Sequence, residues 1–438
     1  MTTTARLTSA ADRVGPKARK PAFRRPKGLR WVLVAELLAN LIGFAVMVHL
    51  ARRLGPASFA RLEYAAAVAA WLLVLVRGGV DVIVYREAAR RPSLIRPLTD
   101  VLIGLRGLAA LTGYTLVLGL AFLAGPERGP VVVVAGLILF PSALVTDVGL
   151  RVSGRFGWIA LAQVVRSLAY VGLAVSLVRN PSDVLRAAWS LVFAEVVGTI
   201  VPLVWHSCHL GWPRVRFRKR AWLVVARRGA IAGVIRFGRV SLYGADLLVL
   251  GWWASAELGS YAAARRIVFG FVALGLVLPA SLAPAIARQW ACGANLARGL
   301  IEDSLVRIWV LSLPAVLVLM VMAERWMPLL FGEHYRGGGP WLVLIAARLP
   351  WLLTASFIQA SLIACRRESW VFDQTVGLVL LALVLVPAAA ALAGPWGVGW
   401  ALLALEIVAA VGGLRMLAKL GLSPRWYLWR HRLQGLLP

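Results

Sequence analysis

Charged side chains inside strongly apolar segments are the residues of this chain best placed to do chemistry. The chain is 60% hydrophobic and has a mean hydropathy of +0.79, which is typical of an integral membrane protein. A charge at the centre of a bilayer costs at least ~2.5–3.5 kcal/mol unless it faces a cavity or a partner. Such residues therefore indicate either a binding cavity or buried ion pairs.

The clearest polar pattern is a stripe formed by Arg236, Arg239, Tyr243 and Asp246. Their spacing of i, i+3, i+7 and i+10 places them within an arc of about 80° on one helix face. Two guanidinium groups on one face could bind an anionic group such as a phosphate, because arginine offers a planar fork of donors. Alternatively, Arg236 lies at a helix end and extends toward water, while Arg239 pairs with an acid on a neighbouring helix.

Two more pairs of polar residues lie one helical turn apart, Glu36 with Asn40 and Arg77 with Asp81. Arg77 and Asp81 either neutralise each other, which we favour, or contact a substrate. Further candidates inside apolar segments are Arg106, Arg166, Glu195 and Arg348. Arginine outnumbers the acids in this set, so an internal cavity would be electropositive and suited to an anionic cargo.

Membrane-length apolar segments must position these residues, since a helix crosses the hydrocarbon core with about 20 residues. The sequence predicts an all-helical, polytopic fold with about twelve such spans. We place them at 31–50, 62–84, 99–124, 130–150, 157–178, 185–207, 230–254, 260–286, 304–324, 338–364, 370–392 and 397–418. Most of the 48 Lys and Arg then fall on one side, which predicts that both termini are cytoplasmic.

The spans form two similar halves with a shared sequence signature. The first copy reads LGPASFARLEYAAA from Leu54, in the loop after the first span, and the second reads SAELGSYAAARRI from Ser255. Tyr64 and Tyr261 occupy matching places, which is typical of a duplicated transporter. The predicted organisation is a basic disordered tail (1–30), an N-terminal six-helix bundle (31–207), a basic linker (208–229), a C-terminal six-helix bundle (230–420) and a cytoplasmic tail (421–438).

Several function classes are excluded or disfavoured by the sequence. It has no phosphate loop, HExxH or GxSxG motif and no long loop for a catalytic domain, so we expect neither an enzyme nor a cofactor. The run HSCH from His206 lacks a second ligand cluster, which disfavours a structural zinc. The net charge of +29 is spread over short loops and the tail, so we expect contact with anionic membrane lipids and not with nucleic acid.

Three segments resemble polysaccharide biosynthesis proteins, the O-antigen and exopolysaccharide flippases of the multidrug/oligosaccharidyl-lipid/polysaccharide exporter superfamily. They read ARRLGPASFARLEYAAAVAAWLLVLVRGGVDVIVYREAAR from Ala51, ADLLVLGWWASAELGSYAAARRI from Ala245 and LLFGEHYRGGGPWLVLIA from Leu329. The resemblance implies two six-helix bundles, related by a pseudo-two-fold axis along the membrane normal, around a cavity that opens alternately to each side. It also implies an undecaprenyl-diphosphate-linked oligosaccharide as cargo, moved to the outer leaflet of a bacterial cytoplasmic membrane, with polymerase and glycosyltransferases as possible partners.

The resemblance also carries over to single positions. Asp246 corresponds to an acidic position in the seventh span of the family, and Arg265 with Arg266 to a basic position that opens the eighth. The sequence departs from the family at Phe59–Arg61, where FAR replaces the usual F-G. Compared with lipid II flippases, two C-terminal spans are missing, which disfavours a role in peptidoglycan synthesis.

These observations combine into one expected mechanism, with alternatives. The expected cavity residues for a diphosphate headgroup are Arg77, Arg106, Arg236, Arg239, Tyr243, Arg265 and Arg266. The expected sites of proton or sodium coupling are Glu36, Asp81 and Asp246. The alternatives are a multidrug or cation antiporter of the same architecture, a membrane glycosyltransferase or polymer ligase, and a scaffold for a polysaccharide assembly complex.

Overall fold

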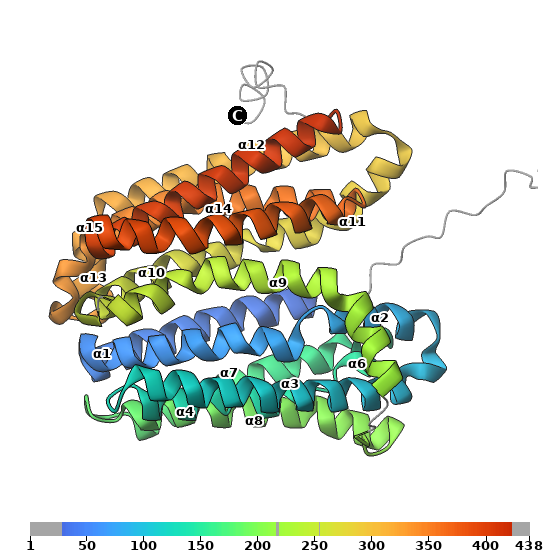
Figure 1. The fold of residues 1–438 in the computed structure, drawn as a ribbon, viewed down its shortest axis with the longest axis horizontal. Helices are drawn as coiled ribbons and strands as arrows, with labels where there is room; N and C mark the ends of the chain where they lie inside the picture. Colours follow the sequence, from blue (N-terminus) through green and yellow to red (C-terminus); the bar gives the residue numbers. More distant parts are fainter. Residues whose placement is uncertain (1–28, 216–218, 254, 423–438) are drawn as a thin grey trace, which may run out of the picture.

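The computed structural model describes residues 29–215, 219–253 and 255–422. Within these ranges the chain folds entirely into helices that run roughly parallel to one another (Figure 1). Helices from the first half form one bundle, blue to green in Figure 1, and helices from the second half form the other, green to red. The predicted basic tail at 1–30 lies almost wholly outside the described residues.

The N-terminal bundle contains α1 to α8. Its helices are α1 (Leu29–Arg77), α2 (Val80–Arg90), α3 (Ile95–Ala124), α4 (Gly129–Gly136), α5 (Leu139–Ala143), α6 (Val148–Val152), α7 (Phe156–Leu177) and α8 (Val184–Leu210), with a short 3-10 helix η1 (Pro92–Leu94). A break at Gly55, with φ 72°, divides α1 into two antiparallel spans. Only glycine adopts this backbone conformation without a steric cost.

The C-terminal bundle contains α9 to α15. Its helices are α9 (Lys219–Trp253), α10 (Ser255–Gly275), α11 (Val277–Cys292), α12 (Ala294–Val321), α13 (Ala323–Phe331), α14 (Gly339–Ala364) and α15 (Glu368–Lys419), with a 3-10 helix η2 (Glu333–Gly338). A break at Ala393 and Gly394 divides α15 in two. The helix α9 begins at Lys219, so much of the stretch 208–229 that was predicted as a basic linker is helical, and the helix starts well before the predicted span start at residue 230.

Eight of the described helices are long and apolar enough to cross a membrane. The breaks in α1 and α15 give each of these helices two spans, and the shorter apolar stretch Gly129–Ala143 adds another candidate. The chain is therefore a multi-pass membrane protein of the predicted all-helical class.

The repeated signature lies on helices, and the prediction of a loop after the first span is wrong. Only Gly55 interrupts α1 there, so Phe59 and Tyr64 are buried helical residues. The second copy begins α10, where Tyr261 is fully buried. The extra arginine of the FAR sequence, Arg61, points away from the core and pairs with Glu127 at 3.0 Å.

The bundles meet where α1 packs against α9 and α10. Near the Gly55 bend, Arg52 donates to the carbonyl oxygens of Leu329 and Leu330, and the Tyr335 hydroxyl donates to the carbonyl of Ala51 at 3.0 Å. We call this region the Gly55 end, and it lies at the left in Figure 1. Farther along α1 toward Arg77, Trp71 donates to Ser241 of α9 at 2.8 Å.

Candidate substrate cavity

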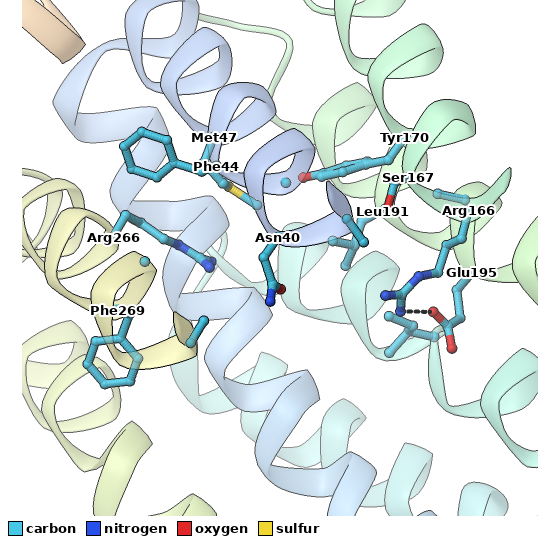
Figure 2. A pocket seen from close by; sticks show the side chains of 16 residues that line it. Asn40, Phe44, Met47, Arg166, Ser167, Tyr170, Leu191, Glu195, Arg266 and Phe269 are labelled. Atoms are coloured by element: carbon cyan, nitrogen blue, oxygen red, sulfur yellow. Dashed lines mark hydrogen bonds and ion pairs between the residues drawn. The ribbon is translucent and has the colours of Figure 1, made fainter. Parts of the chain in front are cut away.

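A cavity of about 320 Å³ lies between the two bundles. Helices α1, α7 and α8 supply its walls on the N-terminal side, together with Ile138 just before α5, and α10 closes it on the C-terminal side (Figure 2). The lining is largely apolar, and its polar and charged members are Asn40, Arg166, Ser167, Tyr170, Glu195 and Arg266. A mostly apolar hollow with a few converging polar groups is typical of a ligand site.

Two guanidinium groups reach this cavity from opposite bundles. Figure 2 shows Arg266 of α10 pointing toward Asn40 of α1, and Arg166 of α7 on the far side beside Glu195. The side chains of Arg166 and Arg266 are 45% and 31% exposed, so both can contact a ligand. Among the described residues Glu195 is the one acid that lines the cavity, so the described charged lining carries a net charge of +1.

Glu195 of α8 organises the N-terminal side of the site. Its carboxylate accepts hydrogen bonds from Arg77 at 2.9 Å, Arg166 at 3.1 Å and Ser142 at 3.1 Å. One acid thus holds two arginines, so the cluster keeps a net positive charge. Arg77 does not line the cavity and borders it through Glu195.

The favoured pairing of Arg77 with Asp81 is wrong. Asp81 instead pairs with Arg106 of α3 at 2.6 Å, and Arg106 also donates to the carbonyl of Val145 at 2.8 Å. The reason is the break at residues 78 and 79, which ends α1 and turns Asp81 onto a separate helix. Arg106 is 2% exposed and is therefore part of the bundle core rather than of the cavity wall.

Arg266 makes an ion pair between the bundles. Its guanidinium forms a two-pronged ion pair with Glu63 of α1, with N to O distances of 2.9 and 3.2 Å. Glu63 is 1% exposed. Such paired, charge-assisted hydrogen bonds are among the stronger polar contacts in proteins.

Asp246 of the α9 stripe belongs to a separate network of charged residues inside the C-terminal bundle. Asp246, which is fully buried, accepts hydrogen bonds from the Tyr261 hydroxyl at 2.8 Å and Arg265 Nε at 2.9 Å. Arg348 lies 3.6 Å from Asp246 and 3.5 Å from Glu406. Asp246 and Arg265, two positions that the family resemblance identifies, are thus direct partners.

The remaining stripe residues, Arg236, Arg239 and Tyr243, lie in two different environments. Arg239 lies over the ring of Tyr243 at 5.8 Å, and both line a second cavity of about 30 Å³ within the C-terminal bundle. The Tyr243 hydroxyl also hydrogen-bonds Ser356 at 2.9 Å. Arg236 is exposed, and the side chain of Glu36 lies outside the described residues.

The residues that the structure brings together at the cavity therefore differ from the residues of the α9 stripe. Of the expected cavity residues, Arg266 alone lines the space between the bundles, joined by Arg166, which the sequence had marked only as a further intramembrane charge. Sequence reasoning missed Glu63 and Tyr170. Glu63 had a usable signal, because it is an acid directly beside the repeated tyrosine.

Among the described residues, no group of three or more His, Cys, Asp or Glu side chains is arranged to hold a metal ion. In the HSCH run, the ring of His209 stacks on Trp205 with centroids 4.7 Å apart. His206 is buried.

Solved structures of three transporters resemble the whole fold at low sequence identity. The lipid II flippase MurJ, in an inward closed conformation, has a TM-score of 0.70 and 13% identity over 88% of this chain and 87% of that one. An inward-facing multidrug resistance MATE family transporter of the MOP superfamily has a TM-score of 0.63 and 15% identity over 93% of this chain and 98% of that one. The MATE multidrug transporter DinF-BH in complex with R6G also has a TM-score of 0.63, with 14% identity over 89% of this chain and 92% of that one. These likenesses show the fold.

The family is shown by the sequence itself. None of the curated proteins compared matches the chain. The sequence profile described as "Polysaccharide biosynthesis protein" matches residues 26–290, which is more than half of the chain and includes the entire N-terminal bundle, α9 and α10. The chain is a multi-pass membrane protein whose fold resembles that of the transporter structures above, and it belongs to the polysaccharide biosynthesis protein family.

Proposed function

We propose that this protein is a flippase that moves an undecaprenyl-diphosphate-linked oligosaccharide from the inner to the outer leaflet of a bacterial cytoplasmic membrane, for O-antigen or exopolysaccharide assembly. The observation that carries the proposal is the approach of Arg166 and Arg266 to one cavity from opposite bundles. Guanidinium groups suit the oxygens of a diphosphate. The membership of a polysaccharide biosynthesis family supports a lipid-linked sugar as the cargo.

Apolar side chains beside the cavity suit the polyprenyl tail. Leu38 and Leu41 of α1, and Phe271 and Leu274 of α10, are exposed and alternate along their helices with residues that line the cavity. A lipid tail can lie against such surfaces while the charged headgroup enters between the bundles. The oligosaccharide would then cross as one bundle rocks against the other, as in other transporters built from repeats.

The orientation is part of the proposal. The basic stretch between α8 and α9 and the basic first thirty residues would lie in the cytoplasm by the positive-inside rule. The Gly55 end then faces outward, and both termini face the cytoplasm. Anionic lipids, a polysaccharide polymerase and glycosyltransferases are the partners expected of such a protein.

A cation or multidrug antiporter is the second candidate, because two of the three structural relatives described are multidrug transporters. The charge of the cavity argues against it. A cationic drug would meet the net positive lining formed by Arg166, Arg266 and Glu195, and like charges repel within a site of low dielectric.

The test is transport by the full chain in proteoliposomes, using a fluorescent oligosaccharide diphosphate lipid and a membrane-impermeant quencher. The variants Arg166→Gln and Arg266→Gln should each slow translocation by about tenfold or more, because each removes a charge-assisted hydrogen bond to the headgroup. Arg61→Gln is the matched control, since Arg61 pairs with Glu127 on the surface of the N-terminal bundle. Unchanged transport in both cavity variants, or efflux of a cationic dye that depends on neither arginine, would refute the proposal.

A further inference from the structure

The ion pair between Arg266 and Glu63 differs from the other arginine contacts of the cavity. Arg77 and Arg166 pair with Glu195 inside the N-terminal bundle, whereas Arg266 of α10 reaches across to α1 of the opposite bundle. The same guanidinium therefore lines the cavity and holds the two bundles together. Glu63 occupies the Nε and Nη2 donors of Arg266, so a ligand that takes this edge of the guanidinium competes with Glu63.

The ion pair lies on the Gly55 side of the cavity, among the contacts that close the bundles against each other. Glu63 follows the buried Phe59 on α1, whose ring meets that of Tyr335 of η2 edge to face at 6.4 Å. The Tyr335 hydroxyl donates to the carbonyl of Ala51. Pro56 of α1 lies against Gly259 so closely that no side chain fits between them.

The cavity beside Arg266 contains a polar atom without a protein partner. The Tyr170 hydroxyl of α7 is buried and accepts or donates no hydrogen bond in the described residues. Tyr170 as a whole is 9% exposed and lines the cavity together with Ser167 and Arg166. In Figure 2 its hydroxyl points into the space between α7 and α1. A buried hydroxyl of this kind favours a polar ligand at this position, because an unpartnered polar group is costly.

From these contacts we infer that the headgroup of the cargo opens the Gly55 end by displacing Glu63 from Arg266. This inference rests on the proposed function and states how binding of the cargo regulates the opening of the Gly55 end. A diphosphate oxygen takes the guanidinium of Arg266, and a second oxygen reaches Arg166 and the Tyr170 hydroxyl. Glu63 is then left as an unpaired carboxylate.

Burial of Glu63 makes the displacement and the opening a single event. An ionised carboxylate that is 1% exposed is strongly disfavoured without a partner, because burying an unpaired charge costs several kcal/mol. Separation of α1 from α10 brings water to Glu63 and removes this penalty. The empty transporter, in which Glu63 keeps Arg266, stays closed at the Gly55 end.

The experiment measures the separation of the bundles directly, in the full chain reconstituted in nanodiscs. The native cysteines Cys208, Cys292 and Cys365 are replaced by serine, and spin labels are attached at Ala57→Cys and His334→Cys. Both positions are exposed and lie on opposite bundles at the Gly55 end. The probes are inorganic diphosphate and geranyl diphosphate, with inorganic monophosphate for comparison, and binding is measured in parallel by calorimetry.

In the wild-type background, diphosphate should shift the distance distribution to longer values. Glu63→Gln should show the longer distance without any ligand and should bind diphosphate about fivefold more tightly or better, which is the lower range of coupling between sites. The double variant Glu63→Arg with Arg266→Glu restores an ion pair and should return the protein to the short distance. Arg61→Gln is the control and should behave as the wild type.

A short distance in ligand-free Glu63→Gln, with a diphosphate response equal to that of the wild type, overturns the inference. Failure of the proposed function has a different signature. In that case neither diphosphate binds to the wild type, yet Glu63→Gln without ligand still decides whether this ion pair holds the Gly55 end closed. A Glu63→Gln protein that does not fold is replaced by the double variant, whose failure to close would also overturn the inference.

Discussion

Replacing Asp246 by Asn should lower the free energy of unfolding of the C-terminal bundle by more than the replacement of an exposed acid does. Asp246 is fully buried and accepts hydrogen bonds from the backbone N–H of Leu247 at 2.8 Å, the Tyr261 hydroxyl at 2.8 Å and Arg265 Nε at 2.9 Å. These donors belong to α9 and α10, and Arg348 of α14 lies 3.6 Å away. The substitution keeps the shape of the side chain and removes its negative charge.

The magnitude follows from the charges that remain. Loss of one member of a buried ion pair costs about 3–5 kcal/mol, because the partner is left uncompensated. Arg265 loses its acid partner, whereas Arg348 keeps Glu406 at 3.5 Å. We therefore expect the lower end of the range, about 3 kcal/mol, which is roughly a hundredfold change in the ratio of folded to unfolded protein.

The assay is denaturant unfolding in detergent micelles, followed by tryptophan fluorescence. Asp373→Asn is the matched control, since Asp373 is an exposed acid on α15 and its change should stay within about 0.5 kcal/mol. If Asp246→Asn unfolds at the same denaturant concentration as Asp373→Asn, Asp246 does not hold the bundle together. Its expected role in ion coupling would then be the better explanation of its position.

Three further predictions concern single contacts. Glu195→Gln should raise the affinity for diphosphate about fivefold, because it releases Arg166, while lowering the midpoint of thermal unfolding. Gly259→Ala should separate the bundles at the Gly55 end, since the new methyl group would overlap the carbonyl of Pro56, and the spin-label distance measures this. The backbone N–H groups of residues 180 and 179 lower the pKa of Asp183 below its ordinary value. Its contribution to stability should therefore be complete at neutral pH and fade as pH falls below about 4, so that the difference in thermal midpoint between wild type and Asp183→Asn shrinks.

Each of these predictions has an outcome that contradicts it. Equal diphosphate affinity in Glu195→Gln and the wild type would mean that Glu195 does not restrain Arg166. Gly244→Ala is the control for Gly259→Ala, because a methyl group there meets no atom within 4 Å, and equal distances in both variants would contradict the close contact. A difference between Asp183→Asn and the wild type that stays constant with pH would show that the carboxylate is not stabilised by its backbone donors.

Composition and periodicity determined the class of this protein. Hydrophobic segments of membrane length favour helices, because a helix forms the hydrogen bonds of its backbone N–H and C=O groups within the segment, where the bilayer offers no water. The repeated signature around Tyr64 and Tyr261 indicated the duplication, and the segments that carry the family resemblance fall largely within the matched residues 26–290. These features are local and are therefore readable from the chain.

The partners of the charged residues were decided by the tertiary structure. Sequence spacing describes neighbours on one helix, so it favoured a pairing of Arg77 with Asp81 and grouped the α9 stripe as one site. In the fold, the break at residues 78 and 79 sends Arg77 to Glu195 and Asp81 to Arg106. Asp246 turns to Arg265 inside its own bundle.

The lining of the cavity between the bundles was also decided by the tertiary structure. Arg166 and Arg266 are 100 positions apart in the sequence, and only the packing of α1 against α7 and α10 brings them to one space. Which face of a helix meets a neighbour depends on the rotation and contacts of both helices. The sequence determined that buried charges exist, and the packing of the two bundles determined which of them face the cavity.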